Sequence, residues 1–123
     1  GNKRDLNRYK WNKNRLENLL KNKTSKESIY YQRIMNLMFI KKQNKAFHPN
    51  AKRENFNLGK KIFCFKRTSL DKKQIIYNIT NLSSKYQILN LNNKFKKFKN
   101  LLGRSKISYG LKLKPYETLW LSN

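Results

Sequence analysis

The chain has 123 residues, of which 30 are Lys or Arg and six are Asp or Glu, so its formal net charge at pH 7 is +24. This length suits one ordinary domain and excludes a complete (β/α)8 barrel, which needs roughly 250 residues. A mean hydropathy of −0.95 and the lack of any apolar run of about 18 residues exclude a transmembrane helix. The first residues are charged and rich in Asn, so they do not resemble a signal peptide, and the single cysteine, Cys64, cannot form an internal disulfide. We therefore expect a cytoplasmic protein, and because residue 1 is Gly rather than Met, we expect that the chain is cut from a longer one.

The positive charge has two interpretations. It is typical of a protein that binds nucleic acid, because cations neutralise phosphates and release their counterions. However, 23 of the basic residues are Lys and only seven are Arg, although Arg matches phosphates and guanine edges better. Lys, Asn, Ile, Phe and Tyr make up 64 of the 123 residues and Val is absent, which is the composition expected from an AT-rich genome. Codon bias explains the abundance of Lys but explains the scarcity of acids less well, so a polyanion partner stays open.

Two helices are expected first in the chain. Residues 13–22 place three leucines at helical spacing and predict a short helix. Ser25, Glu27 and Ser28 form a region suited to capping a second helix. The following residues, up to 46, contain no Pro or Gly, and they carry apolar residues at steps of three and four: Tyr30, Tyr31, Ile34, Met38 and Phe39. This spacing predicts an amphipathic helix over 26–46, which ends before His48-Pro49-Asn50.

Strands are expected in the rest of the chain. Residues 48–59 read as a connecting loop, and aromatic and β-branched residues then predict strands at 61–69, 74–83, 85–92, 111–115 and 116–122. The predicted fold is therefore of the α+β class, with two amino-terminal helices and an antiparallel meander of about five strands. Alternation predicts that Trp120 faces away from a core lined by the other apolar positions, which are Phe63, Phe65, Ile75, Tyr77, Leu111, Leu113, Leu119 and Leu121.

The residues that commonly carry catalysis are few and scattered. The six acids lie in different predicted elements, and no pair has the spacing of an acid/base couple. His48 and Cys64 are too few for a structural zinc site, which needs about four ligands. Cys64 lies between two phenylalanines in a predicted strand, where a buried thiol is usually inert. We therefore expect no catalytic residue, no metal and no cofactor in this chain.

One segment combines basic and aromatic residues as nucleic-acid binding requires. Phe95 and Phe98 alternate there with lysines, and the predicted patch comprises Lys94, Lys96, Lys97, Lys99 and Arg104. The alternative is that the two phenylalanines anchor the segment on the sheet while the lysines extend into water.

Five segments match a known pattern in order. They are Arg4-Asp5-Leu6-Asn7-Arg8, Ala46-Phe47-His48-Pro49, Phe65-Lys66-Arg67, Asn81-Leu82-Ser83, and Leu113-Lys114-Pro115-Tyr116 with Trp120-Leu121. Together they span the chain and resemble the carboxyl-terminal end of the sucrose phosphorylase subfamily of family-13 glycoside hydrolases, in the alpha-amylase superfamily. Glucosylglycerate phosphorylases are close members of this branch. Each segment alone is a weak signal, but five in the right order are specific.

The resemblance implies where the domains of this chain lie and where the catalytic acids of the family lie. Residues 1–57 would be the last loop and helices of a (β/α)8 barrel, and residues 58–123 a carboxyl-terminal antiparallel β domain. Members of the family transfer glucose from a glucoside to phosphate with retention, using an Asp nucleophile, a Glu acid/base and a further Asp. These three acids lie on earlier barrel strands and match no acid of this sequence, so the resemblance implies that the chain is inactive alone.

The resemblance also implies substrate contacts and partners. Arg4 matches the family's arginine that faces the phosphate or fructosyl side, and Asn7 and Arg8 follow it in the same loop. An arginine suits a phosphate dianion because it donates two parallel hydrogen bonds. The alternative is that Arg4 and Arg8 bind backbone carbonyls or Asp5. The implied partners are the remainder of the barrel, a sugar and inorganic phosphate.

Three hypotheses follow. In the first, the chain is the end of a sucrose-phosphorylase-like glycosyltransferase of carbohydrate metabolism, and it completes and stabilises the barrel. In the second, it is a small basic RNA- or DNA-binding protein, such as a ribosomal component from an AT-rich genome. In the third, it is a split or decayed gene product without activity.

Overall fold

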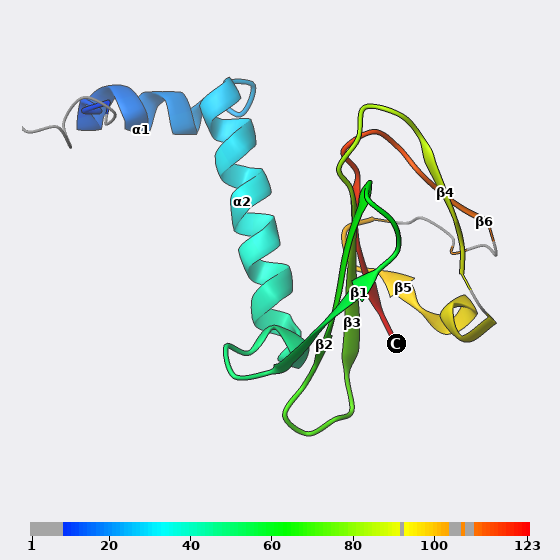
Figure 1. Ribbon diagram of the computed structural model, residues 1–123. Helices are drawn as coiled ribbons and strands as arrows, with labels where there is room; N and C mark the ends of the chain where they lie inside the picture. The colour runs from blue at the N-terminus through cyan, green and yellow to red at the C-terminus, as the bar shows by residue number, and fades with distance from the viewer. Residues whose placement is uncertain (1–8, 92, 104–106, 108–109) are drawn as a thin grey trace, which may run out of the picture. The chain divides into compact units, whose positions relative to one another are not determined.

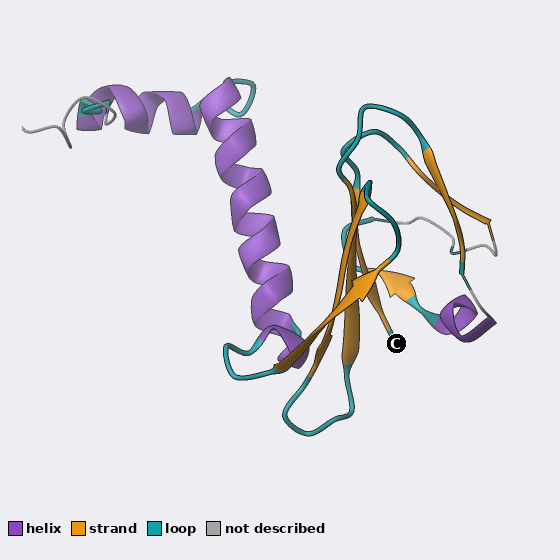
Figure 2. Cartoon of the chain, in the orientation of Figure 1, coloured by secondary structure: helices purple, strands orange, loops and turns teal. Residues whose placement is uncertain are grey.

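The computed structural model describes residues 9–91, 93–103, 107 and 110–123. The chain forms two compact units, one up to Phe39 and one from Ile40 onward. Helices come first and strands follow, as Figure 1 and Figure 2 show, so the predicted α+β class is confirmed. No helix among the described residues is long and apolar enough to cross a membrane.

Both predicted helices form, and polar side chains cap their amino-terminal ends. Helix α1 (Lys13–Lys21) follows Asn12, whose Oδ1 accepts a hydrogen bond of 3.1 Å from the backbone N–H of Arg15. Helix α2 (Lys26–Gln43) follows Ser25, whose Oγ accepts from the N–H of Ser28 at 3.1 Å. These contacts satisfy N–H groups that have no partner within the helix, which explains where each helix begins.

Helix α2 differs from its prediction in length and in character. It ends at Gln43, and a 3-10 turn, η1 (Lys45–Phe47), replaces its expected last turn. Its apolar residues do not form one stripe: Leu37, Met38, Phe39 and Ile40 are consecutive, and each residue of a helix is rotated by about 100° from the previous one. The amphipathic pattern was therefore a wrong prediction, because apolar side chains surround most of the helix.

The strands build two antiparallel sheets. The main sheet has the order β1-β2-β3-β7-β5, and a second sheet pairs β4 with β6. The strands are β1 (Lys52–Asn57), β2 (Ile62–Thr68), β3 (Ile75–Asn81), β4 (Gln87–Asn90), β5 (Lys99–Asn100), β6 (Gly110–Leu113) and β7 (Thr118–Ser122). The expected simple meander is wrong, because β7 returns to pair with β3 while β4 and β6 leave the main sheet.

Strand β1 was missed, since residues 48–59 were expected to form a loop. Its side chains are mostly charged or amide groups and mostly exposed, so the segment shows no apolar alternation. It pairs with β2 through its backbone, with Phe56 opposite Cys64. Charged side chains on an edge strand also discourage pairing with other chains. The division of the chain into a barrel part and a β domain at residue 57 stays a prediction.

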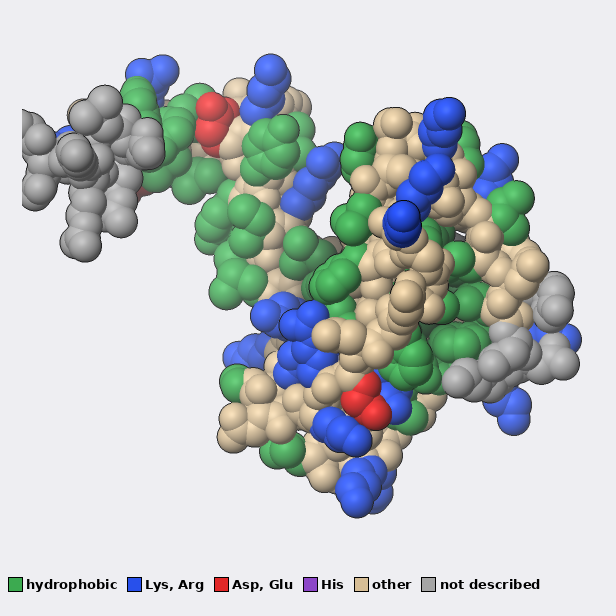
Figure 3. Space-filling model, in the orientation of Figure 1, with side chains coloured by type: hydrophobic (Ala, Val, Ile, Leu, Met, Phe, Trp, Pro, Cys, Tyr) green, Lys and Arg blue, Asp and Glu red, His purple; other side chains and the backbone are tan. Residues whose placement is uncertain are grey.

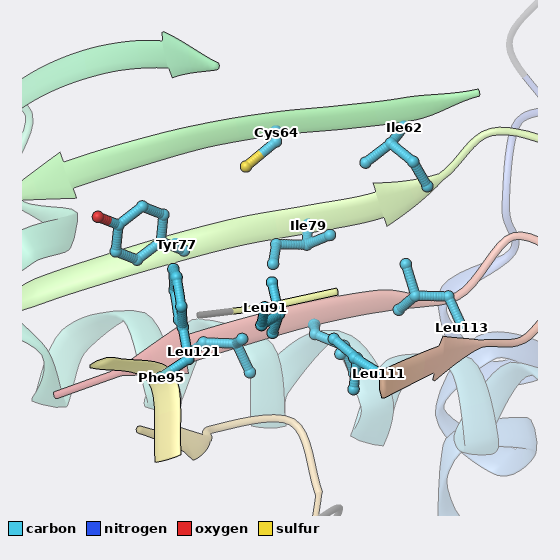
Figure 4. Packing of buried hydrophobic residues seen from close by; sticks show 10 residues of the cluster. Ile62, Cys64, Tyr77, Ile79, Leu91, Phe95, Leu111, Leu113 and Leu121 are labelled. Atoms are coloured by element: carbon cyan, nitrogen blue, oxygen red, sulfur yellow. The ribbon is translucent and has the colours of Figure 1, made fainter. Parts of the chain in front are cut away.

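The core lies between the main sheet and the β4–β6 pair. Figure 4 shows side chains from both sheets pointing toward one another, and the cluster comprises Ile62, Cys64, Tyr77, Ile79, Leu91, Phe95, Leu111, Leu113, Leu119 and Leu121. The predicted core positions on β3, β6 and β7 are confirmed for Tyr77, Leu111, Leu113, Leu119 and Leu121. Phe63 and Phe65 were wrongly placed, because Cys64 pairs with the buried Ile79, so its two neighbours face the other side of the sheet.

Candidate functional site

The residues predicted to bind substrate lie outside the described part of the chain. This holds for Arg4, Asn7 and Arg8, and also for Arg104 of the predicted nucleic-acid patch. Within that patch the side chains of Lys96, Lys97 and Lys99 are exposed, and the side chain of Lys94 lies outside the description. Both sets of residues stay predictions.

The aromatic half of the predicted nucleic-acid patch faces the core. Phe95 is 8% exposed, and its ring centroid lies 4.9 Å from that of Tyr77. Phe98 also packs against the core cluster, with its ring centroid 5.2 Å from that of Phe95. Neither ring offers a face on which a base could stack, so the alternative, in which the phenylalanines anchor the segment, is the one observed.

Two of the described acids, Glu54 and Asp71, form ion pairs and hydrogen bonds within the fold. Glu54 lies 2.7 Å from Lys66 Nζ and 3.4 Å from Lys52 Nζ, and the hydrogen bond from Lys66 lowers the pKa of Glu54. Asp71 accepts from Ser69 Oγ at 2.6 Å and from Lys45 Nζ at 3.0 Å. These bonds hold the pKa of Asp71 well below its usual range. Each carboxylate is ionised and already engaged, which does not suit a general acid.

Cys64 is buried in β2, and this burial changes the acidity of its thiol. Burial raises the pKa of the Cys64 thiol to about 11, so the thiol is protonated at neutral pH and unreactive. Among the described residues no three His, Cys, Asp or Glu side chains come together as metal ligands. A cavity of about 240 Å³ borders Cys64, and its lining is mostly apolar. Ligand pockets usually measure roughly 300–1,000 Å³ and carry several polar groups, so this cavity does not suit a sugar.

Arg67 joins the segment after α2 to the main sheet. From β2, its Nε donates to the carbonyl of Ala46 at 2.8 Å, and its Nη2 donates to the carbonyl of His48 at 2.6 Å. The ring of Phe47, between these residues, lies with its centroid 4.7 Å from that of Trp120 on β7. Three of the five segments that carried the family resemblance therefore meet at one place.

Gln74 completes this junction, and the sequence gave no reason to single it out. Its Oε1 accepts from the N–H of Ala46 at 3.0 Å, and its Nε2 donates to Asn44 Oδ1 at 2.6 Å. Asn78 on β3 holds the Trp120 indole through a 3.0 Å bond to Nε1. We call Arg67, Gln74, Phe47 and Trp120 the η1 junction; it fixes the chain after α2 on the face of the sheet opposite the core.

Asn81 makes a second junction between distant segments. Its side chain is fully buried, and its Nδ2 donates to the carbonyls of Lys85 at 2.8 Å and Lys114 at 2.9 Å. Its Oδ1 accepts from the N–H of Ser83 at 3.0 Å and from Ser83 Oγ at 2.8 Å. The Asn81-Leu82-Ser83 segment thus binds the turn that contains Pro115 and Tyr116, so the described segments of the resemblance are structural contacts.

The comparisons with known proteins rest on structure. No protein-family model matches the sequence, and no curated protein matches it. Among solved structures, a MutB mutant from crystals soaked with trehalulose is similar over 87% of this chain, with a TM-score of 0.64 and 12% identity. Another MutB mutant, in complex with the substrate sucrose, is also similar over 87% of this chain, with a TM-score of 0.63 and 12% identity. A mutant of the trehalose-6-phosphate hydrolase TreA of Bacillus licheniformis is similar over 86% of this chain, with a TM-score of 0.59 and 15% identity.

These structural similarities concern the fold of this chain. The chain spans only about a fifth of the neighbours' length, 19% of each MutB chain and 20% of TreA. A fold like that of most of this chain is therefore found as part of larger proteins.

Proposed function

We propose that the chain is the carboxyl-terminal part of a family-13 glycoside-transforming enzyme and that it completes and stabilises a (β/α)8 barrel. The observation that carries the proposal is the similarity of nearly the whole chain to about a fifth of MutB and of TreA. The agreement of two independent signals adds support. The segments that suggested this superfamily from sequence lie in the η1 junction and around Asn81, where they hold the fold together.

Helix α2 supplies the contact surface for the barrel. Eight large apolar side chains between Ile29 and Phe39 are exposed, and Tyr30, Met38 and Phe39 reach 62%, 58% and 61%; Figure 3 shows apolar side chains gathered on this helix. A helix that is apolar on most sides belongs inside a larger assembly, and an exposed apolar surface of this extent marks an interaction site. The partner in this proposal is the remainder of the barrel.

The catalytic carboxylates belong to that remainder. Retaining chemistry needs two carboxyl groups about 5–5.5 Å apart, one as nucleophile and one as acid/base, and the carboxylates of Glu54, Asp71 and Glu117 already bind other groups of this chain. The finer part of the proposal is a sucrose-phosphorylase-like activity in the cytoplasm, in which glucose passes between a glucoside and phosphate. Arg4 would then bind the phosphate dianion by paired hydrogen bonds.

The test uses the full polypeptide to which this chain belongs. We expect it to form glucose 1-phosphate from sucrose or glucosylglycerate and inorganic phosphate, and we expect Arg4→Lys to raise the KM for phosphate about tenfold or more, because Lys cannot donate two parallel bonds. The control Arg15→Lys, on the exposed α1, should leave this KM unchanged. Hydrolysis without phosphorolysis would contradict the phosphorylase activity but not the proposal that the chain is part of a family-13 enzyme.

The barrel contact has its own test. Met38→Glu places a charge on the apolar surface of α2, whereas Asn36→Glu places the same charge on an exposed polar position of the same helix. We expect Met38→Glu to lower the thermal stability of the full polypeptide, with Asn36→Glu close to the parent. Equal stability of the two variants would contradict the proposed barrel contact.

A further inference from the structure

Three loops of the unit from Ile40 onward are tied together at one end of the main sheet. They are residues 58–61 between β1 and β2, residues 82–86 between β3 and β4, and residues 114–117 between β6 and β7. The N–H of Leu82 donates to the carbonyl of Lys61 at 2.8 Å, and the N–H of Tyr116 donates to the carbonyl of Ser83 at 3.3 Å. Asn81 binds the carbonyls of both Lys85 and Lys114. We call this region the Asn81 end. These hydrogen bonds, including those of the buried Asn81 side chain, hold its loops in fixed positions.

The Asn81 end concentrates exposed positive charge. Its five lysines are exposed and none is in a described ion pair: Lys60, Lys61, Lys85, Lys114 and, from β6, Lys112. Figure 3 shows basic side chains gathered over this end of the sheet. The acid of these loops, Glu117, is used internally, since its Oε2 accepts from the N–H of Lys114 at 2.8 Å. Codon bias can raise the number of lysines, but the bonds from Asn81 to the carbonyls of Lys85 and Lys114, and from Leu82 to the carbonyl of Lys61, hold the loops that carry them side by side.

Two tyrosines lie among these lysines and are free of the core. Tyr86 is 55% exposed and Tyr116 is 69% exposed. Lys112 Nζ lies 4.4 Å from the centroid of the Tyr86 ring, so cation and ring already share one surface. Tyr116 sits in a tight turn with φ of 56°, and its N–H bond to Ser83 holds the turn in place. Exposed rings beside lysines provide both elements that single-stranded nucleic acid needs, a stacking surface and backbone neutralisation.

We propose that the Asn81 end binds single-stranded nucleic acid. Its lysines contact phosphates, and the rings of Tyr86 and Tyr116 stack on unpaired bases. A duplex hides the faces of its bases, so a single strand fits this surface better. The segment around Phe95, which carries the basic and aromatic pattern in the sequence, packs its rings against the core, whereas the rings at the Asn81 end are exposed. The site lies within one unit of the chain and does not depend on the proposed barrel.

The test is binding of a labelled 20-nucleotide oligothymidylate to the 123-residue chain, measured by fluorescence anisotropy between 50 and 200 mM salt. We expect the triple variant Lys60→Gln, Lys85→Gln and Lys114→Gln to lose about tenfold in affinity or more. The slope of log affinity against log salt should become shallower by about two, because each phosphate contact on a single strand contributes roughly 0.7. The matched control, Lys96→Gln, Lys97→Gln and Lys99→Gln, removes the same charge elsewhere and should lose less than about threefold.

Stacking is tested separately from charge. Tyr116→Ala should weaken binding about fivefold or more while the salt slope stays unchanged, because a stacked base contributes about 1–3 kcal/mol without releasing counterions. An equal or larger loss in the control triple variant would overturn the proposal in favour of the segment around Phe95. A Tyr116→Ala variant that binds like the parent, or tighter binding to heparin or to phosphatidylserine vesicles than to the oligonucleotide, would overturn it in favour of a polyanion or a membrane surface.

Discussion

Replacing Asn81 by Ala tests how much the hydrogen bonds of its buried side chain contribute to the stability of the fold. The side chain is fully buried and makes four hydrogen bonds, two as donor and two as acceptor. Each bond contributes about 1 kcal/mol net, which sums to about 4 kcal/mol. The freed groups of Ser83 lie close enough to solvent to regain part of this through water. We therefore expect Asn81→Ala to lower the free energy of unfolding by about 3 kcal/mol.

The assay is urea unfolding of the 123-residue chain, followed by circular dichroism and tryptophan fluorescence. With a slope of about 1.5 kcal/mol per M, the midpoint should fall by about 2 M. The control Asn55→Ala removes an exposed amide from the edge strand β1 and should change stability by less than about 0.5 kcal/mol. A loss below about 1 kcal/mol in Asn81→Ala would refute the role given to this junction.

Asn81→Asp refines the same test. It keeps the acceptor for Ser83 but loses both donors and places a carboxyl against the carbonyls of Lys85 and Lys114. The folded state then raises the pKa of this carboxyl, so the variant should gain stability, relative to the parent, as the pH falls from neutral into the usual range for Asp, and the gain should be complete below that range. A stability difference that does not change with pH would contradict the bonding assigned to Asn81 Nδ2.

Three further outcomes follow from the contacts. Arg67→Lys should cost about 1–2 kcal/mol in urea unfolding, because Lys cannot reach the carbonyls of Ala46 and His48 together; an unchanged midpoint would argue against the η1 junction. Cys64 should react with a thiol reagent at pH 8 about a hundredfold more slowly than a free cysteine, since its pKa is about 11, and at the ordinary rate in denaturant. Equal rates in both conditions would mean that the thiol is exposed. Asp71 has a lowered pKa, so the stability it contributes is present above about pH 4 and lost as the pH falls below it. The stability difference between the parent and Asp71→Asn should therefore shrink on acidification, and a constant difference would contradict this assignment.

The sequence predicted those elements whose side chains have a regular pattern. The two helices and the strands around Cys64, Ile79 and Leu121 have clear spacing, and their positions were confirmed. Strand β1 was missed because an exposed edge strand pairs through its backbone, and its polar side chains give no alternation. The face of β2 was assigned wrongly because Phe63 and Phe65 are larger than Cys64; only the pairing of Cys64 with Ile79 decides which side is inside.

The candidate sites depended on contacts between distant residues. Gln74 and Asn81 are ordinary amides in the sequence, and their roles come from groups 28 and 33 positions away. The lysines of the Asn81 end lie in three separate loops and in β6, so no local run of charge identified them. In contrast, the local run around Phe95 looked like a binding motif but uses its rings for the core. The spacing of residues along the chain predicts which side of a helix or strand is apolar. Which loops lie next to one another depends on the order of the strands in the sheets.

The central claim, that this chain completes a barrel enzyme, is tested most directly by sequencing the coding region immediately before residue 1. We predict an open reading frame that continues upstream into a (β/α)8 barrel carrying the Asp nucleophile, the Glu acid/base and the further Asp. A start codon directly before residue 1, with no barrel gene nearby, would contradict the claim.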